Sequence, residues 1–131
     1  MTINFTRISL ITNSDNISEW YEDEIPLSNG SESVKLTSLM PSDGYQIRKS
    51  PIGFESSFHC SSYPQYVFIL QGIMEITLQD GTSRKFIPGQ HFLSTDLRPD
   101  NIIFDETKHG HKSANISDEI LITLFLRIIQ K

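Results

Sequence analysis

The sequence predicts a single all-β domain whose strands close into a barrel. Apolar residues recur mostly at every second position, in short segments that end at turn-forming residues. The chain has 131 residues, the length of one domain, and a domain of this size buries about two thirds of its unfolded surface without a disulfide or a metal. Many short strands must pack as two sheets or close into a barrel, because a lone sheet leaves an apolar face and two edges exposed.

The expected strands follow one another along the whole chain. Their ranges are 6–12, 34–40, 44–49, 54–60, 65–71, 73–79, 83–87, 90–94, 101–105, 109–115 and 119–128. A short helix is expected within residues 13–24, and the Ser-, Asn- and Gly-rich segment 27–33 predicts a loop. No linker or internal repeat divides the chain, so we expect one domain, with an N-terminal extension over about 1–33 and the barrel over about 34–131.

Two dipeptides predict tight turns between these strands. Asp80-Gly81 separates "MEITLQ" from "TSRKF", and it predicts a hairpin because Gly accepts the positive φ that such turns require. Pro88-Gly89 predicts a second turn, since Pro fixes φ at one corner and Gly tolerates the next.

The segment "QYVFIL" (65–70) is apolar on both faces of the expected strand. Val67 and Ile69 share the side of Gln65, whereas Tyr66, Phe68 and Leu70 point the other way. A strand that is apolar on both faces is typical of a barrel wall covered by another layer or another subunit. We therefore expect a homodimer that covers the outer face, and we expect 65–79 to form adjacent antiparallel strands.

Charge and cysteine content exclude several classes of partner. The net charge is −5, and no run of basic residues is longer than two, as at Arg84-Lys85, so the chain lacks the basic surface that binds nucleic acid or an anionic membrane. Cys60 is the single cysteine, and "MTINFTRISL" lacks the features of a secretory signal, which favours a reducing cytoplasm. The apolar segment 119–129 is shorter than the roughly 20 residues of a membrane helix.

The spacing of polar residues before the 65–71 strand resembles the first motif of the cupins. That motif reads G-x5-H-x-H-x3/4-E-x6-G, and this chain reads Gly53-x5-His59-x-Ser61-x3-Gln65-x6-Gly72. Every interval matches, whereas Ser61 stands in place of the second histidine and Gln65 in place of the glutamate. The resemblance implies a jelly-roll barrel, also called a double-stranded β-helix, in a single domain.

The second cupin motif is matched in part. His111-x3-Asn115 fits the end of G-x5-P-x-G-x2-H-x3-N, but Glu106 and Lys108 replace its Pro and Gly. The segments "HCSSYPQY", "LQG", "QDGTSRKFIPGQ" and "KHGHKS" resemble a subgroup of small single-domain cupins. This likeness extends from "RISLITNSD" almost to the end of the chain, and 96–104 looks inserted relative to the subgroup.

The resemblance and the strand pattern together predict a metal site. Side chains alternate along a strand, so His109 and His111 are expected to share the face that forms the barrel interior. With His59 and Gln65 they would supply nitrogen and oxygen donors to one divalent ion, namely zinc, iron, nickel or manganese. His109 is the expected fourth ligand, or a residue that only lines the pocket.

Other readings remain open for these residues. A lone histidine in a β protein usually makes surface or hydrogen-bonded contacts, and the Gln65 amide could instead satisfy buried backbone groups. His91 has no partner at a useful spacing and is left out of the site. Cys60 should face away from His59 by alternation, so we expect a small buried apolar side chain and not a nucleophile.

The function expected from the sequence is stated only by class. Glu75, Arg48 and Tyr45 are candidates to contact a small-molecule substrate, although each could lie on a solvated face of a sheet. The first hypothesis is metal-assisted chemistry on a small polar organic molecule, and the alternative is a metal-free binding or sensor protein; a purely structural dimer subunit is a third. The fold itself hosts many reactions, so the class of enzyme, if any, is not predicted.

Overall fold

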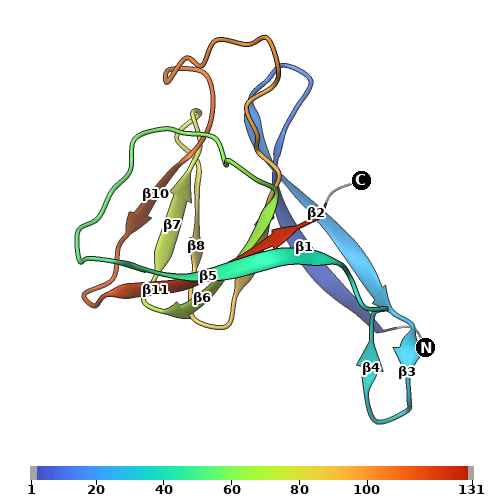
Figure 1. Ribbon diagram of the computed structural model, residues 1–131. Helices are drawn as coiled ribbons and strands as arrows, with labels where there is room; N and C mark the ends of the chain where they lie inside the picture. Colours follow the sequence, from blue (N-terminus) through green and yellow to red (C-terminus); the bar gives the residue numbers. More distant parts are fainter. Residues whose placement is uncertain (1–2, 130–131) are drawn as a thin grey trace.

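The computed structural model describes residues 3–129 as strands, turns and loops, with no helix in this range (Figure 1). The strands are β1 (Ile3–Thr12), β2 (Ser18–Leu27), β3 (Asn29–Gly30), β4 (Lys35–Leu36), β5 (Ser42–Ser50), β6 (Gln65–Gln71), β7 (Met74–Thr77), β8 (Ser83–Phe86), β9 (His91–Ser94), β10 (Lys112–Asn115) and β11 (Leu121–Ile128). The predicted all-β fold class is therefore confirmed. No helix in the described residues could cross a membrane.

The strands form two facing sheets and a small separate hairpin. The larger sheet has the order β2-β1-β9-β6-β11-β5, and the smaller sheet has the order β10-β7-β8. All pairings are antiparallel except β1 with β9. The third pair, β3 with β4, forms an arm that extends away from the barrel (Figure 1). Two opposed, mainly antiparallel sheets around one core are the architecture of a jelly-roll barrel.

The core fills the space between the two sheets. Alternation places every second residue of each strand inside, so Val67 and Ile69 of β6 face Met74 and Ile76 of β7 across the barrel. The buried apolar cluster is completed by Leu10, Leu78, Phe86, Phe92 and Leu121. Gln65 lies on the same inner face of β6 as Val67 and Ile69, so the predicted facing of this strand is confirmed.

The chain changes sheets at Gly72. The expectation that residues 65–79 form adjacent antiparallel strands is wrong, because β6 lies in the larger sheet and β7 in the smaller one. Gly72 makes this corner with a φ of 82°. A Cβ atom at this position would lie 3.0 Å from the Leu121 Cα and the Ser117 Oγ, so only glycine fits without a shift.

The N-terminal segment pairs with the barrel as a long hairpin. The prediction of a short helix within 13–24 is wrong, because β2 begins at Ser18 and pairs with β1 over ten residues. The Asn13 side chain accepts hydrogen bonds from the Asp15 and Ile17 amides, and Asn16 takes a φ of 63°, so the polar residues form a turn instead of a helix start. This hairpin continues the larger sheet through the pairing of β1 with β9.

Three of the expected strands are either much shorter than predicted or absent from the described residues. Residues 34–40 contribute only β4, and 54–60 make only isolated bridges at Glu55 and His59. Residues 101–105 form no strand, and Asn101 has a φ of 64°. In each segment apolar residues point to solvent or to the pocket without a neighbouring strand to pair with.

Both predicted turns are confirmed. Gly81 and Gly89 have φ values of 87° and 91°. The Asp80 side chain accepts hydrogen bonds from the Thr82 amide and hydroxyl at 2.9 and 2.6 Å, which fixes the β7–β8 hairpin.

Candidate functional site

A pocket of about 390 Å³ opens between the two sheets. Its floor is apolar and is formed by Val67, Met74, Ile76, Phe92 and Leu121. Polar side chains lie around this floor, and His59, Gln65 and His111 are among them. Three of the four predicted metal ligands therefore line one cavity.

His59 and His111 are neighbours across a pair of backbone hydrogen bonds. The His59 amide donates to the His111 carbonyl at 2.8 Å, and the His111 amide donates to the His59 carbonyl at 2.9 Å. The ring centroids lie 4.8 Å apart with the planes tilted by 55°. This single antiparallel bridge is the local structure that brings the two cupin-like motifs together.

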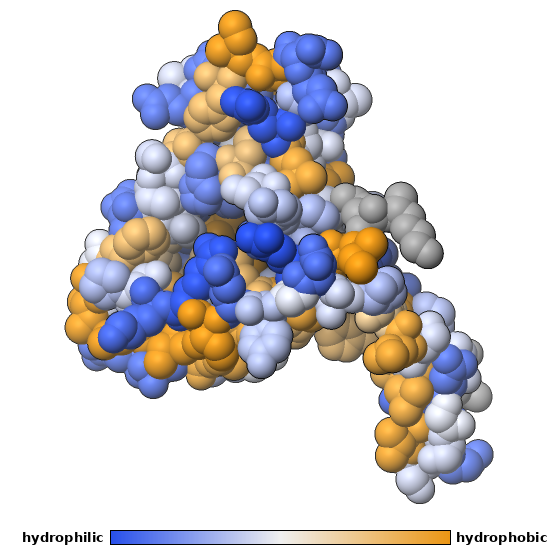
Figure 2. Space-filling view, viewed as in Figure 1, coloured by the Kyte–Doolittle hydropathy of each residue, from blue (hydrophilic) through white to orange (hydrophobic). Residues whose placement is uncertain are grey.

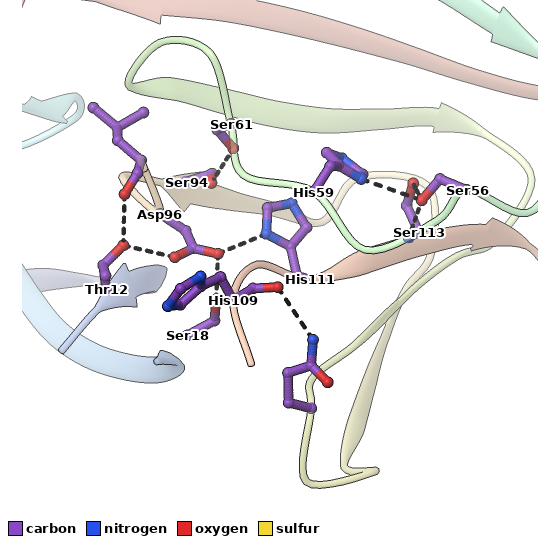
Figure 3. A network of polar contacts seen from close by, with 12 residues as sticks. Thr12, Ser18, Ser56, His59, Ser61, Ser94, Asp96, His109, His111 and Ser113 are labelled. Carbon is purple, nitrogen blue, oxygen red and sulfur yellow. Dashed lines mark hydrogen bonds and ion pairs between the residues drawn. The ribbon is translucent and has the colours of Figure 1, made fainter. Parts of the chain in front are cut away.

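Each imidazole uses its Nδ1 atom to bind an oxygen of the protein. His59 Nδ1 donates to the Ser57 carbonyl at 2.9 Å. His111 Nδ1 donates to Asp96 Oδ2 at 2.8 Å (Figure 3). A neutral imidazole that donates from Nδ1 carries its free lone pair on Nε2. In the neutral form, both rings therefore offer Nε2 to a ligand.

Asp96 is the buried centre of a polar network that the sequence did not predict. Its carboxylate is 1% exposed and accepts hydrogen bonds from Thr12 at 2.6 Å, from Ser18 and from His111 (Figure 3). Burial alone would raise the pKa of this carboxyl, but the hydrogen bonds from His111, Ser18 and Thr12 outweigh burial and hold the pKa below its usual value. Asp96 is therefore an anion that orients the His111 ring.

Gly110 explains the close approach of the two histidines. It has a φ of 80°, and a Cβ atom there would lie 2.4 Å from the His59 carbonyl oxygen. Any side chain at this position would push residue 110 away from His59 and break the bridge.

Gly110 also explains why His109 does not share a face with His111. The alternation expected for residues 109–115 is wrong at its start, because the chain at Gly110 is not extended and β10 begins only at Lys112. His109 Nδ1 accepts a hydrogen bond from the Asp105 amide at 2.9 Å, and its ring packs 6.0 Å from the Phe104 ring. His109 is not among the residues that line the pocket.

Gln65 and Ser61 occupy the positions of cupin ligands with different contacts. Gln65 is 8% exposed, and within residues 3–129 its side-chain amide makes no hydrogen bond to another side chain or to the backbone. Ser61 is also buried, and its hydroxyl bonds the Ser94 hydroxyl at 2.6 Å. The Gln65 amide is thus free to contact a ligand, whereas the Ser61 hydroxyl already has a partner.

The three predicted substrate contacts have different positions. Arg48 lines the pocket from β5. Tyr45 pairs with Leu126 on the outer face of the larger sheet and borders only a second, shallower hollow. Glu75 does not line the pocket: the turn after Gly72 makes Met74 and Ile76 the inner residues of β7, which leaves Glu75 on the opposite face.

Arg127 is a pocket residue that the sequence analysis overlooked. It lies on β11 two residues after Phe125, on the same inner face, and it pairs in register with Gln65 of β6. Alternation along 119–128 could have found it, since Thr123 and Phe125 share its face. Asp96 had no such signal, because it lies where the chain departs from the cupin pattern.

Two titrations are shifted by the pocket environment. Desolvation by burial lowers the pKa of His59 despite the opposing hydrogen bond to the Ser57 carbonyl, so His59 is neutral near pH 7. Burial raises the pKa of the Cys60 thiol to about 11. Cys60 is half-buried and borders the pocket, and a thiol with this pKa is a poor nucleophile.

Comparisons with known proteins find similar proteins only among solved structures. No protein-family model matches the chain, and no curated protein matches it. The cupin domain of Cnp3 from Schizosaccharomyces pombe is 18% identical, with 98% of this chain and 88% of that chain covered and a TM-score of 0.49. A conserved protein of unknown function from Streptococcus pyogenes is 21% identical, with coverages of 74% and 71% and a TM-score of 0.46.

A third similar structure carries an enzyme name. A sugar phosphate isomerase of the cupin superfamily from Silicibacter pomeroyi is 16% identical, with a TM-score of 0.45. The match covers 66% of this chain and half of the isomerase. Two opposed, mainly antiparallel sheets, with His59, Gln65 and His111 lining one pocket between them, give this chain a jelly-roll barrel like that of a small cupin.

Proposed function

We propose that the protein binds a small polar organic molecule in the barrel pocket and that a divalent metal ion, held by His59, His111 and Gln65, assists chemistry on it. The observation that carries this proposal is that His59 and His111 both use Nδ1 for a hydrogen bond, which leaves the Nε2 lone pair of each ring available. Both Nδ1 atoms are already bound to oxygen acceptors, which is the arrangement that orients metal-ligating histidines in many proteins.

The donor set suits an ion that keeps open positions. Two imidazoles and one amide oxygen supply three donors without negative charge, and within residues 3–129 no group of three His, Cys, Asp or Glu side chains converges. Imidazole suits zinc, iron and nickel, and an amide oxygen is a harder ligand that manganese also accepts. A bound ion would polarise a carbonyl or phosphoryl oxygen of the molecule in the pocket.

The chain's own residues orient the ligand and handle protons. The apolar floor excludes water from one side of the pocket, which strengthens polar contacts on the other side. Asp96 fixes the His111 ring, and without a bound metal it would also stabilise an imidazolium if His111 Nε2 accepted a proton from the ligand. His59 is neutral near pH 7 and is ready to accept a hydrogen bond or to bind a metal.

Metal content of purified and reloaded protein tests this proposal. We expect one zinc, nickel, manganese or ferrous ion per chain, measured by plasma mass spectrometry after desalting. His59→Ala and His111→Ala should each weaken the apparent affinity by at least about 10-fold, because too few donors remain to compete with water. Gln65→Glu should strengthen it, since a carboxylate adds a negative charge beside the cation.

A matched variant controls for removal of a histidine in general. His109→Asn removes an imidazole of the same chain, and it keeps an oxygen that can accept the Asp105 amide proton. This variant should retain the metal at the wild-type level. Equal metal content in His59→Ala, His111→Ala and wild type would overturn the metal proposal.

A metal-free small-molecule binder is the second candidate. The small donor set favours it, because structural and catalytic zinc sites usually have three or four charged or imidazole ligands. In that case the protein would bind no ion in the same assay. The two Nε2 atoms would then accept hydrogen bonds from the ligand directly.

A further inference from the structure

Two arginines stand at one end of the pocket. Arg48 of β5 and Arg127 of β11 line both the pocket and an adjoining outer hollow of about 200 Å³. Arg127 pairs in register with Gln65, so the arginine end of the pocket continues past Gln65 towards the apolar floor.

Aromatic rings hold both guanidinium groups. The Arg48 guanidinium carbon lies 3.8 Å from the centroid of the Phe125 ring, and that of Arg127 lies 3.7 Å from the Tyr63 ring. A guanidinium stacked on a ring is fixed by one face, while its N–H edge stays free to bind an anion through two parallel hydrogen bonds. Arg48 uses one N–H for the neutral Gln46 oxygen, at 3.2 Å.

No carboxylate neutralises this pair. Within residues 3–129, no Asp or Glu side chain lines the pocket, and neither arginine forms an ion pair. Asp43 borders only the outer hollow. Desolvation lowers the pKa of Arg48, and the nearby positive charge of Arg127 lowers it by a smaller amount. Two unpaired cations in a protein of net charge −5 mark a local site for negative charge.

We propose that Arg48 and Arg127 bind the anionic group of the pocket ligand, so the ligand is a small organic anion, either a carboxylate or a phosphate ester. This inference rests on the proposed function in one respect, that a small molecule occupies the pocket. The anionic group lies between the two guanidinium edges. The rest of the molecule extends past Gln65 over the apolar floor, with its reacting end towards His59 and His111.

Titrations with malonate and with inorganic phosphate test the inference. The probes are added to labelled protein and followed by amide NMR shifts at low and moderate salt. We expect saturable binding with a Kd of about 1 mM or tighter and weaker binding as salt rises. The preferred probe tells a carboxylate from a phosphate ligand. Arg48→Gln and Arg127→Gln should each weaken binding about 10-fold or more, since charge-assisted hydrogen bonds are lost.

The controls separate this inference from the proposed function. Arg84→Gln removes an arginine that pairs with Glu22 outside the pocket, and it should bind both probes like wild type. Glycerol, a neutral probe, should not shift the pocket amides. Absence of saturable binding up to about 20 mM of both probes, or wild-type affinity in Arg48→Gln and Arg127→Gln, overturns the anion inference. Metal loss in His59→Ala and His111→Ala is measured separately and would still support the metal site.

A second inference concerns the outer face of the larger sheet. Strand register places apolar side chains in two rows across it. One row runs Tyr45, Leu126, Tyr66 and Leu93, and reaches Tyr21 on β2. The other row contains Ile47, Leu124, Phe68 and His91, and the Phe5 ring stacks on His91 at 5.0 Å. Leu93 is buried and His91 is half-buried, whereas the residues towards the two edges of the sheet, Tyr45, Ile47, Tyr21 and Phe5, remain exposed.

The exposed area of this face is large enough for a dimer. Phe5, Tyr21, Tyr45, Ile47 and Leu70 are 42–68% exposed, so these five alone expose about 500 Å² if each side chain offers about 200 Å². Half-buried neighbours bring the face near the roughly 800 Å² that one partner contributes to a stable interface. The charged pair on the face, Arg7 with Asp23, is closed by hydrogen bonds at 3.0 and 2.5 Å, so two copies can meet without repulsion.

The β3–β4 arm adds a second unpartnered apolar surface. It extends from the barrel, and Figure 2 shows apolar residues along one side of it. Val34, Leu36, Leu39 and Met40 are all exposed, with Leu39 exposed completely. An arm of this shape cannot bury its apolar side against its own barrel, but it can do so against a neighbouring copy.

We infer that a second copy of this chain covers the outer sheet face around a two-fold axis and that each arm packs on the partner. Sedimentation at about 10 μM should therefore give a dimer, as expected for an interface of this size. Ile47→Glu should give a monomer, because it places a charge at an exposed position of one apolar row. Ile103→Glu is the matched control: Ile103 is 90% exposed in a loop away from this face, and the variant should remain dimeric.

The assembly inference has clear contrary results. A concentration of about 10 μM is well above the Kd expected for a stable interface. A wild-type monomer at this concentration would overturn the dimer inference. A dimer that survives in Ile47→Glu would also overturn it. Leu39→Ser should weaken the dimer, and unchanged dimerisation in this variant would remove the arm from the interface.

Discussion

Replacing Asp96 by asparagine should strongly destabilise the protein. The carboxylate accepts hydrogen bonds from Thr12, Ser18 and His111, and it is almost fully buried. An amide keeps one acceptor oxygen and turns the other position into a donor, so at least one partner is left facing an N–H group. Each hydrogen bond to a charged group contributes about 1.5–3 kcal/mol, and a buried partner left unpaired costs about 1–3 kcal/mol more.

We therefore expect Asp96→Asn to lower the free energy of unfolding by about 3 kcal/mol or more. Urea unfolding followed by circular dichroism measures this change. Asp118→Asn is the control, because Asp118 is exposed, and its effect should stay below about 0.5 kcal/mol. In a Ser18→Ala background, the cost of Asp96→Asn should shrink by about 1 kcal/mol, since the two residues share one hydrogen bond.

The pH dependence follows from the same carboxylate. Its pKa in the folded protein is below the unfolded value, so its contribution is present above about pH 4 and is lost as pH falls through the folded pKa. Asp96→Asn should lack this part of the acid transition. A loss of less than about 1 kcal/mol in Asp96→Asn would refute the expectation that the buried hydrogen bonds from Thr12, Ser18 and His111 to this carboxylate stabilise the fold.

Three further predictions concern residues in or beside the bridge between His59 and His111. Gly110→Ala should cost at least about 2 kcal/mol, from the clash with His59 and the positive φ, whereas Gly81→Ala, with open space around its Cβ position, should cost about 1 kcal/mol in the same urea assay. Cys60 should react slowly with iodoacetamide at pH 8, since its pKa is about 11, and a rate like that of free cysteine would contradict this. The pKa of His59 is lowered in the folded protein. The free energy of unfolding should therefore fall as pH drops below about 6.5, where the unfolded chain takes up the proton first. His59→Gln should lack that part of the fall, and an identical pH profile in the variant would contradict the lowered pKa of His59.

The fold class followed from the sequence because alternation and turn residues are local signals. The facing of β6 and the turns at Gly81 and Gly89 were predicted in this way. The pairing of strands was not, because alternation does not say which sheet a strand joins. The corner at Gly72, which separates β6 from β7, depends on close contact with Leu121 nearly 50 residues later.

The candidate site shows the same division. His59, Gln65 and His111 follow from motif spacing, and they do line one pocket. Asp96 acts through contacts with Thr12 and Ser18, 84 and 78 residues away, and no local pattern marks it. His109 does not face the pocket because the alternation of a strand does not continue through Gly110, which has a positive φ.

The position of β11 between β6 and β5 sets an order of events during synthesis. Of the strands described here β11 is the last to be made, yet it pairs on both sides within the larger sheet. Until it arrives, β6 and β5 each present an unpaired backbone edge beside the exposed apolar side chains of "QYVFIL". Open edges of this kind bind one another and aggregate, and pairings so distant in sequence form slowly. A ribosome-bound chain that stops before residue 121 is thus a natural client for chaperones, and a chain shortened there should be recovered from cells mainly as insoluble material.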